Sequence, residues 1–188
     1  MQEEELQMHI DEAKQLMDDA IEHLKKELAK ISTGKASPRM LDGVLVDYYG
    51  APTPLNQVAN VGTSDSKTIT IQPWEKSMLA PIEKAIFEAN LGLTPQNDGE
   101  LIRINIPMLT EERRKELAKR AKALGEETKQ GVRAARRDGM DAIKKAVKEG
   151  YPEDAGKDRE DEIQNMTNSY NSKIDKLVDA KEGDIMQI

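Results

Sequence analysis

The longest uninterrupted helical pattern in the sequence runs from Thr110 to Glu149, and it constrains the fold more than any other stretch. Thr110 is a good helix-capping residue, and the two glutamates that follow it suit the positive end of a helix dipole. Gly150, with a proline two positions later, forms a normal helix stop. A straight helix of roughly forty residues would be about 60 Å long. Such a helix cannot bury its apolar stripe alone, so it requires partners of similar length.

The two sides of this predicted helix differ in chemistry. On a helical wheel, the apolar and small residues that gather on one side are Leu117, Ala121, Leu124, Thr128, Ala135, Ala142 and Ala146. The basic residues that gather on the other side are Lys115, Lys119, Lys122, Lys129, Arg133, Arg136, Arg137, Lys144 and Lys148. The pattern predicts one side that faces a protein core and one basic side that does not.

The charge of this stretch is opposite to that of the rest of the chain. Residues 111–148 contain 13 Lys and Arg and 7 Asp and Glu, a net charge of +6; the whole chain carries −7, which leaves −13 elsewhere. A charged helix face is usually only a solvated face, but this asymmetry favours a local binding surface for phosphate. We therefore predict an RNA-binding face, whose candidate contact residues are Arg133, Arg136, Arg137, Lys129 and Lys122.

Two further stretches have a helical period. Apolar side chains recur every three or four positions through residues 3–31, and a similar pattern covers residues 163–177. Three long amphipathic helices bury their stripes most economically as an elongated antiparallel three-helix bundle. We assign residues 1–31 and 108–188 to this discontinuous domain.

Between the first and second helices the period changes to two, which is typical of strands. Alternating apolar residues predict strands at 44–49, 58–61, 68–71 and 101–106. Gly50 and the two prolines after it are expected to end the first of these strands. A helix is predicted from Ser77, as its cap, to Asn90. Residues 35–105 thus form a small β/α/β domain inserted into the bundle, and the fold class is α+β.

The chain crosses between the two predicted domains twice, once at each end of the inserted domain. The first crossing contains a Gly-Lys pair shortly before a proline, and the second contains an Ile-Pro pair. Glycine allows positive φ values and proline interrupts regular structure, so bending at two short crossings would strain few residues. We predict a hinge at residues 32–37 and 106–109, with the candidate residues Gly34, Lys35, Ile106 and Pro107.

The composition excludes several classes of site. The chain has no cysteine, so disulfides, thiol nucleophiles and thiolate metal sites are impossible. No apolar run approaches membrane-spanning length, and the acidic N-terminus lacks a signal-peptide core, so we expect a soluble cytoplasmic protein without membrane contact. His9 and His23 have no third ligand at useful spacing and are expected at the surface rather than on a metal. We find no nucleophile elbow or dinucleotide fingerprint, and we expect neither an enzyme nor a cofactor.

Eight short motifs, in this order along the chain, resemble the bacterial ribosome recycling factor family. They are Thr33-Gly-Lys-Ala-Ser-Pro38, Leu41-Asp42-Gly43, Tyr48-Tyr49-Gly50, Pro54-Leu55, Glu83-Lys-Ala-Ile86, Leu91-Gly92-Leu93, Leu109-Thr-Glu-Glu-Arg-Arg-Lys115 and Val132-Arg133-x-x-Arg136-Arg137-Asp138. No single motif is decisive, but eight in register are specific. The chain departs from the family directly after the arginines, where Gly139-Met140 replaces the Ala-Asn that is common there.

The resemblance implies an L-shaped, tRNA-like molecule built from a three-helix bundle and a smaller β/α/β domain. It implies a factor that acts with elongation factor G to split post-termination ribosomes into subunits and free them from mRNA, while the partner hydrolyses GTP. It also implies that Arg133, Arg136 and Arg137 contact rRNA of the large subunit, on the intersubunit face. We expect a monomer.

Two functions of other classes remain open from the residues alone. A helical scaffold that dimerises through its apolar seams would show a dimer mass in solution. An undetected hydrolase would show turnover by the purified chain without any partner.

Overall fold

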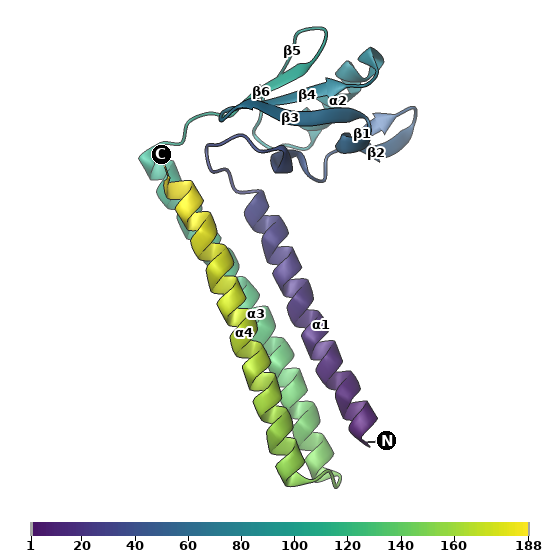
Figure 1. The fold of residues 1–188 in the computed structure, drawn as a ribbon, viewed down its shortest axis with the longest axis vertical. Coiled ribbons are helices and arrows are strands. Elements are labelled where there is room, and N and C mark those ends of the chain that lie inside the picture. The colour runs from purple at the N-terminus through teal and green to yellow at the C-terminus, as the bar shows by residue number, and fades with distance from the viewer. Residues whose placement is uncertain (1, 188) are drawn as a thin grey trace. The chain divides into compact units, whose positions relative to one another are not determined.

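The computed structural model describes residues 2–187, which divide by packing into two units. The larger unit contains the described residues up to Ile31 and from Arg114 onward, and the smaller unit is Ser32–Arg113. The larger unit consists of long helices and the smaller one carries the strands (Figure 1). The chain is therefore α+β, with a sheet-containing unit inserted into a helical bundle, as the sequence predicts.

Three helices form the larger unit: α1 (Gln2–Ala29), α3 (Glu111–Lys148) and α4 (Glu153–Met186). α3 runs antiparallel to both α1 and α4 (Figure 1). Thr110 caps α3 as predicted, because its Oγ1 accepts a hydrogen bond from the backbone N–H of Arg113 at 3.1 Å. Gly150, with φ at +109°, ends the turn after α3 and allows the chain to reverse.

The buried face of α3 is rotated relative to the predicted one. Leu124, Ala142 and Ala146 are only half-buried, so their placement on the core face was partly wrong. The buried residues of α3 are Leu117, Ala121, Gly125, Thr128, Val132, Ala135, Gly139 and Ile143. Two of the buried residues, Gly125 and Gly139, are glycines, which do not count as apolar on a wheel. Val132 and Ile143 are apolar and fully buried, and the predicted face also left them out.

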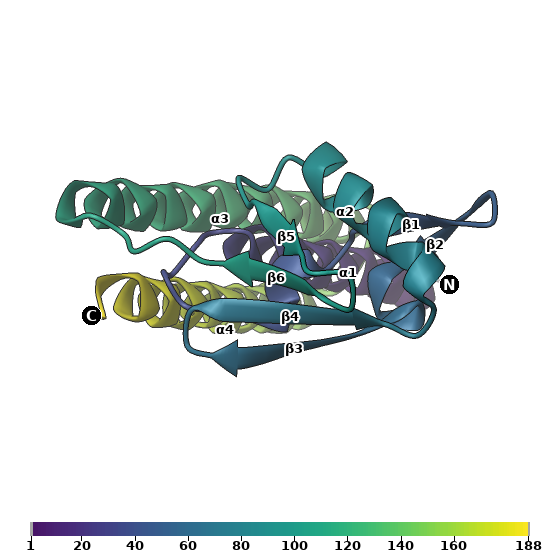
Figure 2. The ribbon, with the colours of Figure 1, turned by 90° about the horizontal axis from the view of Figure 1, so that it is seen from above.

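The smaller unit contains two antiparallel sheets. A two-stranded sheet is formed by β1 (Leu45–Tyr48) and β2 (Ala51–Pro54). A four-stranded sheet has the order β3-β4-β6-β5, from β3 (Ala59–Asp65), β4 (Thr68–Pro73), β6 (Ile102–Asn105) and β5 (Pro95–Asn97). Figure 2 shows these four strands side by side. Helix α2 (Leu79–Glu88) contacts β1 and β5, and short 3-10 turns lie at Pro38–Leu41, Leu55–Gln57 and Lys76–Met78.

The isoleucine alternation in the sequence defines the core of the four-stranded sheet. Ile69 pairs with Ile104 and Ile71 with Ile102 across β4 and β6, and all four side chains are fully buried. Ile82 of α2 is equally buried in the same core. The predicted period-two strands and their inward faces are confirmed here, because alternate residues of a strand point to one side of the sheet.

Two local predictions for this unit were wrong. The first strand does end before Gly50, and Tyr49 and Gly50, with φ values of +48° and +88°, form the tight turn of the β1–β2 hairpin. The two prolines, however, do not end that strand, because they lie within β2. The prolines of β2 are tolerated because that strand pairs on one side only. Ser77 lies in a 3-10 turn and does not cap α2, which begins at Leu79 without a side-chain cap.

Candidate nucleic-acid interface

The five candidate RNA-binding residues lie along one flank of α3, and the structure divides them into two groups. We call Lys122, Lys129, Arg133, Arg136 and Arg137 the basic flank. Lys122, Arg133 and Arg137 are exposed. Lys129 and Arg136 are half-buried, and each contacts a side chain of α4. The basic flank therefore combines solvated cations with cations that are held by the neighbouring helix.

Lys129 is paired with a carboxylate. Its Nζ lies 2.7 Å from Oδ1 of Asp175 on α4 and 3.9 Å from Oε1 of Glu126, and 22% of its side chain is exposed. The hydrogen bond with Asp175 raises the pKa of Lys129. A cation that is already neutralised in this way adds little to the attraction of a phosphate.

Arg136 is held by a neutral partner instead. Its Nε–H donates to Oε1 of Gln164 at 2.9 Å, and Nε2 of Gln164 donates in turn to Oδ1 of Asn168 at 2.9 Å. Within residues 2–187, no carboxylate forms an ion pair with Arg136. The guanidinium is thus oriented by α4 while its charge is left uncompensated.

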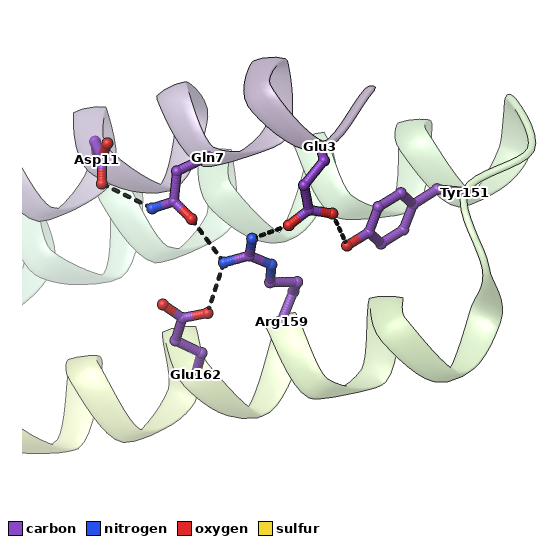
Figure 3. A network of polar contacts seen from close by, with 6 residues as sticks. All are labelled: Glu3, Gln7, Asp11, Tyr151, Arg159 and Glu162. Atoms are coloured by element: carbon purple, nitrogen blue, oxygen red, sulfur yellow. Dashed lines mark hydrogen bonds and ion pairs between the residues drawn. The ribbon is translucent and has the colours of Figure 1, made fainter. Parts of the chain in front are cut away.

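A second cluster of charged groups lies where α1 begins and where α3 turns into α4 (Figure 3). Arg159 of α4 forms an ion pair with Glu3 of α1, and its Nη1 donates to Gln7 at 2.8 Å and to Glu162 at 3.0 Å. The Tyr151 hydroxyl donates to Glu3 at 2.5 Å. The hydrogen bond from Tyr151, together with that from Arg159, lowers the pKa of Glu3. This network ties α1 to α4 and to the α3–α4 turn, so its role is structural.

The predicted hinge residues Gly34, Lys35, Ile106 and Pro107 all fall within the smaller unit. Ile106 is buried in the sheet core, and its N–H donates to the carbonyl of Lys67 at 2.7 Å. The N–H of Ala36 donates to the carbonyl of Ser66 at 2.8 Å. Both crossings are therefore fastened to the same β3–β4 turn, and bending would have to occur before Ala36 and after Ile106. The hinge itself stays a prediction.

Sequence reasoning missed the α4 residues that hold the basic flank. Gln164, Asn168 and Asp175 are polar residues of a charged helix, and they become identifiable only when the register between α3 and α4 is known. The described residues contain no group of three or more His, Asp or Glu that could hold a metal ion. In the same part of the chain, every helix is too short or too polar to cross a bilayer.

The comparison with known proteins decides the family. The family model described as "Ribosome recycling factor" matches residues 24–186. The chain belongs to the ribosome recycling factor family.

Relatives in this recycling factor family match over nearly the full length. The ribosome-recycling factor of Flavobacterium johnsoniae is 51% identical over 185 residues, which cover 98% of this chain and 99% of the relative. That of Porphyromonas gingivalis is 52% identical over 173 residues, or 92% and 93% of the two chains. The family assignment confirms the resemblance carried by the sequence motifs.

Two solved structures support the same conclusion for the fold. A solution structure of ribosome recycling factor matches with a TM-score of 0.86 and 36% identity, covering 98% of both chains. A second match has a TM-score of 0.68 and 41% identity, covering 97% of this chain and 99% of the other. This second structure is described as models for the T. thermophilus ribosome recycling factor and the E. coli elongation factor G bound to the E. coli post-termination complex. Membership in the recycling factor family makes the chain a translation factor rather than an enzyme.

Proposed function

We propose that this protein, together with elongation factor G and GTP, splits post-termination ribosomes into subunits and frees them from mRNA. The observation that carries the proposal is the near full-length match to a recycling factor described with elongation factor G on a post-termination complex. In this reaction the partner hydrolyses the GTP, and the chain contributes binding surfaces.

The basic flank of α3 is the proposed contact with large-subunit rRNA. Residues 111–148 have a net charge of +6 on a chain whose total charge is −7, so phosphates are attracted to this side and repelled elsewhere. Exposed Arg133, Arg137 and Lys122 can each release counterions when they contact phosphate. The asymmetry favours one orientation on the ribosome rather than coating of any RNA.

Arg136 and Lys129, the two residues of the basic flank that contact α4, contribute differently to rRNA binding. Arg136 keeps its full charge beside Gln164 and offers two terminal amino groups to phosphate. Lys129 forms an ion pair with Asp175, which neutralises its charge, so it adds less to rRNA binding. We therefore rank Arg133, Arg136 and Arg137 as the principal contacts and Lys122 as a peripheral one.

We also propose bending at the two crossings, 32–37 and 106–109, during splitting. The backbone bonds of Ala36 and Ile106 to the β3–β4 turn place this bending before Ala36 in the first crossing and after Ile106 in the second. Gly34 already has φ at +76°, a conformation that other residues rarely adopt.

The test is a dissociation assay with purified components. Post-termination ribosomes are mixed with the protein, elongation factor G and GTP, and subunits are separated on sucrose gradients. We expect free subunits only when all three are present, and no GTP hydrolysis by the protein alone. A variant in which Ala replaces Arg133, Arg136 and Arg137 should fail to split the ribosomes. Circular dichroism checks that this variant is folded. Intact ribosomes in the complete mixture, or splitting that is independent of the partner, would refute the proposal.

A further inference from the structure

The middle of α4 differs in composition from the rest of that helix. α4 contains ten Asp and Glu residues, but none of them falls between positions 163 and 174. The polar side chains of this segment include four amides, Gln164, Asn165, Asn168 and Asn171. We call residues 163–174 the amide segment. A helix that is otherwise rich in carboxylates thus carries a stretch without any negative charge.

Two contacts place the amide segment beside the basic flank. Gln164 at its start accepts from Arg136, and Asp175 directly after its end pairs with Lys129. The segment therefore runs antiparallel to the stretch of α3 between Lys129 and Arg136. Carboxylates at these positions would cancel the positive potential of the arginines, whereas amides leave it intact.

The hydrogen-bond chain Asn168–Gln164–Arg136 has only one consistent direction. A guanidinium can donate but not accept, so the side chain of Gln164 must present its oxygen to Nε of Arg136. Nε2 of Gln164 then points to Oδ1 of Asn168, which fixes the amide orientation from the other side. With Nε engaged, the two terminal amino groups of Arg136 form the edge that can bind phosphate in a bidentate manner.

We propose that Gln164 is a positioning residue for rRNA binding: it holds the guanidinium of Arg136 in its binding orientation without neutralising its charge. The inference rests on the proposed function of the basic flank. A long side chain that is ordered before binding loses less rotamer freedom when it binds. Asp175 shows the contrasting arrangement, because it orients Lys129 and cancels its charge at the same time.

Three variants of the full chain separate orientation from charge. Gln164→Met keeps the volume but removes the acceptor, Gln164→Glu keeps an acceptor but adds a negative charge, and Arg136→Ala removes the cation. Each is measured for affinity to isolated large ribosomal subunits, for the slope of log affinity against log monovalent salt at fixed magnesium, and for the Arg136 Nε–H signal by NMR in the free protein.

The expected results differ for each variant. Gln164→Met should lose the protected Nε–H signal and bind about threefold to tenfold more weakly, the ordering cost of one long side chain, with an unchanged salt slope. Gln164→Glu should keep the signal but lower the salt slope by about one, because the charge is neutralised. Arg136→Ala should reduce both the affinity and the slope.

A double variant tests whether Gln164 acts only through Arg136. Gln164→Met in the Arg136→Ala background should have no further effect on affinity, whereas a purely structural role would give additive losses and a lower melting temperature. Asn165→Met, which removes an exposed amide of the same segment, is the matched control and should bind like wild type.

Several outcomes would overturn the inference. Wild-type affinity for Gln164→Met, additive losses in the double variant, or a retained Nε–H signal without Gln164 would each exclude a positioning role. If Arg133→Ala, Arg136→Ala and Arg137→Ala all bind like wild type, the proposed rRNA face itself is wrong. Failure of the proposed rRNA face can be distinguished from failure of the Gln164 proposal, because the three arginine variants leave Gln164 unchanged.

Discussion

A Cβ atom added to Gly125 of α3 would lie 2.7 Å from Cγ2 of Val178 on α4. The same holds at Gly139, where a Cβ would lie 2.8 Å from Cδ1 of Ile163. Separations below 3.0 Å essentially never occur for real Cβ atoms. Gly125 therefore allows a close approach of α3 to α4 that a larger residue would prevent, and this offsets its low helix propensity. At Gly139 the nearest atom is the end of a flexible isoleucine side chain, which can shift.

Gly131 of the same helix provides the matched contrast, because a Cβ added there would meet no atom within 4 Å. We expect Gly131→Ala to raise the free energy of unfolding by about 0.5–1 kcal/mol, since alanine is the better helix former. Gly125→Ala should lower it by about 1–3 kcal/mol through overpacking against Val178. Urea denaturation of both variants measures the two values, and effects of the same sign would contradict the packing role.

The rotated core face of α3 predicts which apolar truncation is more damaging. Ile143 is fully buried with Leu6, Ile10 and Ile163, so Ile143→Ala should destabilise the protein by about 2–5 kcal/mol. Leu124 is half-buried, and Leu124→Ala should cost clearly less. Thermal melts compare the two directly. A larger loss for Leu124→Ala would restore the face predicted from the wheel.

The network in Figure 3 predicts a stability difference that depends on pH. Tyr151 and Arg159 lower the pKa of Glu3, so the carboxylate contributes stability above its usual pKa and loses it as the pH falls through the lowered value. Glu3→Gln should therefore be less stable than wild type at pH 7, and the difference should shrink in acid, below about pH 4. Urea unfolding at several pH values measures this difference.

Glu4 is a suitable control for that experiment, because the structure describes no hydrogen bond or ion pair of its side chain. Glu4→Gln should change the stability little, at neutral and at acid pH alike. A Glu3→Gln difference that is constant with pH would show that the Glu3 contacts do not depend on ionisation.

The basic flank predicts unequal effects for two exposed cations of α3. Arg137 lies on the basic flank, whereas Lys145 lines a hollow with Gln2, Glu5 and His9 of α1. Arg137→Ala should weaken binding to large ribosomal subunits and lower the salt slope by about one. Lys145→Ala should leave both unchanged. Equal losses would mean that the net charge of the helix, rather than one flank, attracts the ribosome.

The Lys129–Asp175 pair predicts a gain of binding. Asp175→Asn removes the carboxylate that pairs with Lys129, so the basic flank gains one uncompensated charge. We expect tighter binding to large subunits and a salt slope that is steeper by up to about one. The loss of stability should stay below about 1 kcal/mol, because the Asp175 side chain is 59% exposed. Unchanged binding would place Lys129 outside the rRNA contact.

The sequence by itself determined the elements whose signals are local. The periods of 3.6 and 2 identify α1, α3 and α4 and the isoleucine strands, because each period reflects the geometry of its own segment. The Thr110 cap follows from a hydroxyl three residues before the N–H that it bonds. The basic side of α3 likewise follows from the helical positions of its lysines and arginines, without reference to any other helix.

Only the tertiary structure decided what depends on register between distant segments. The sequence does not indicate that Gly125 meets Val178, or that Gly139 meets Ile163, so it misplaced the centre of the buried face. Nor does it distinguish Lys129, neutralised by Asp175, from Arg136, held by the uncharged Gln164. These residues lie far apart along the chain, and they meet only because α3 and α4 pack side by side in this register.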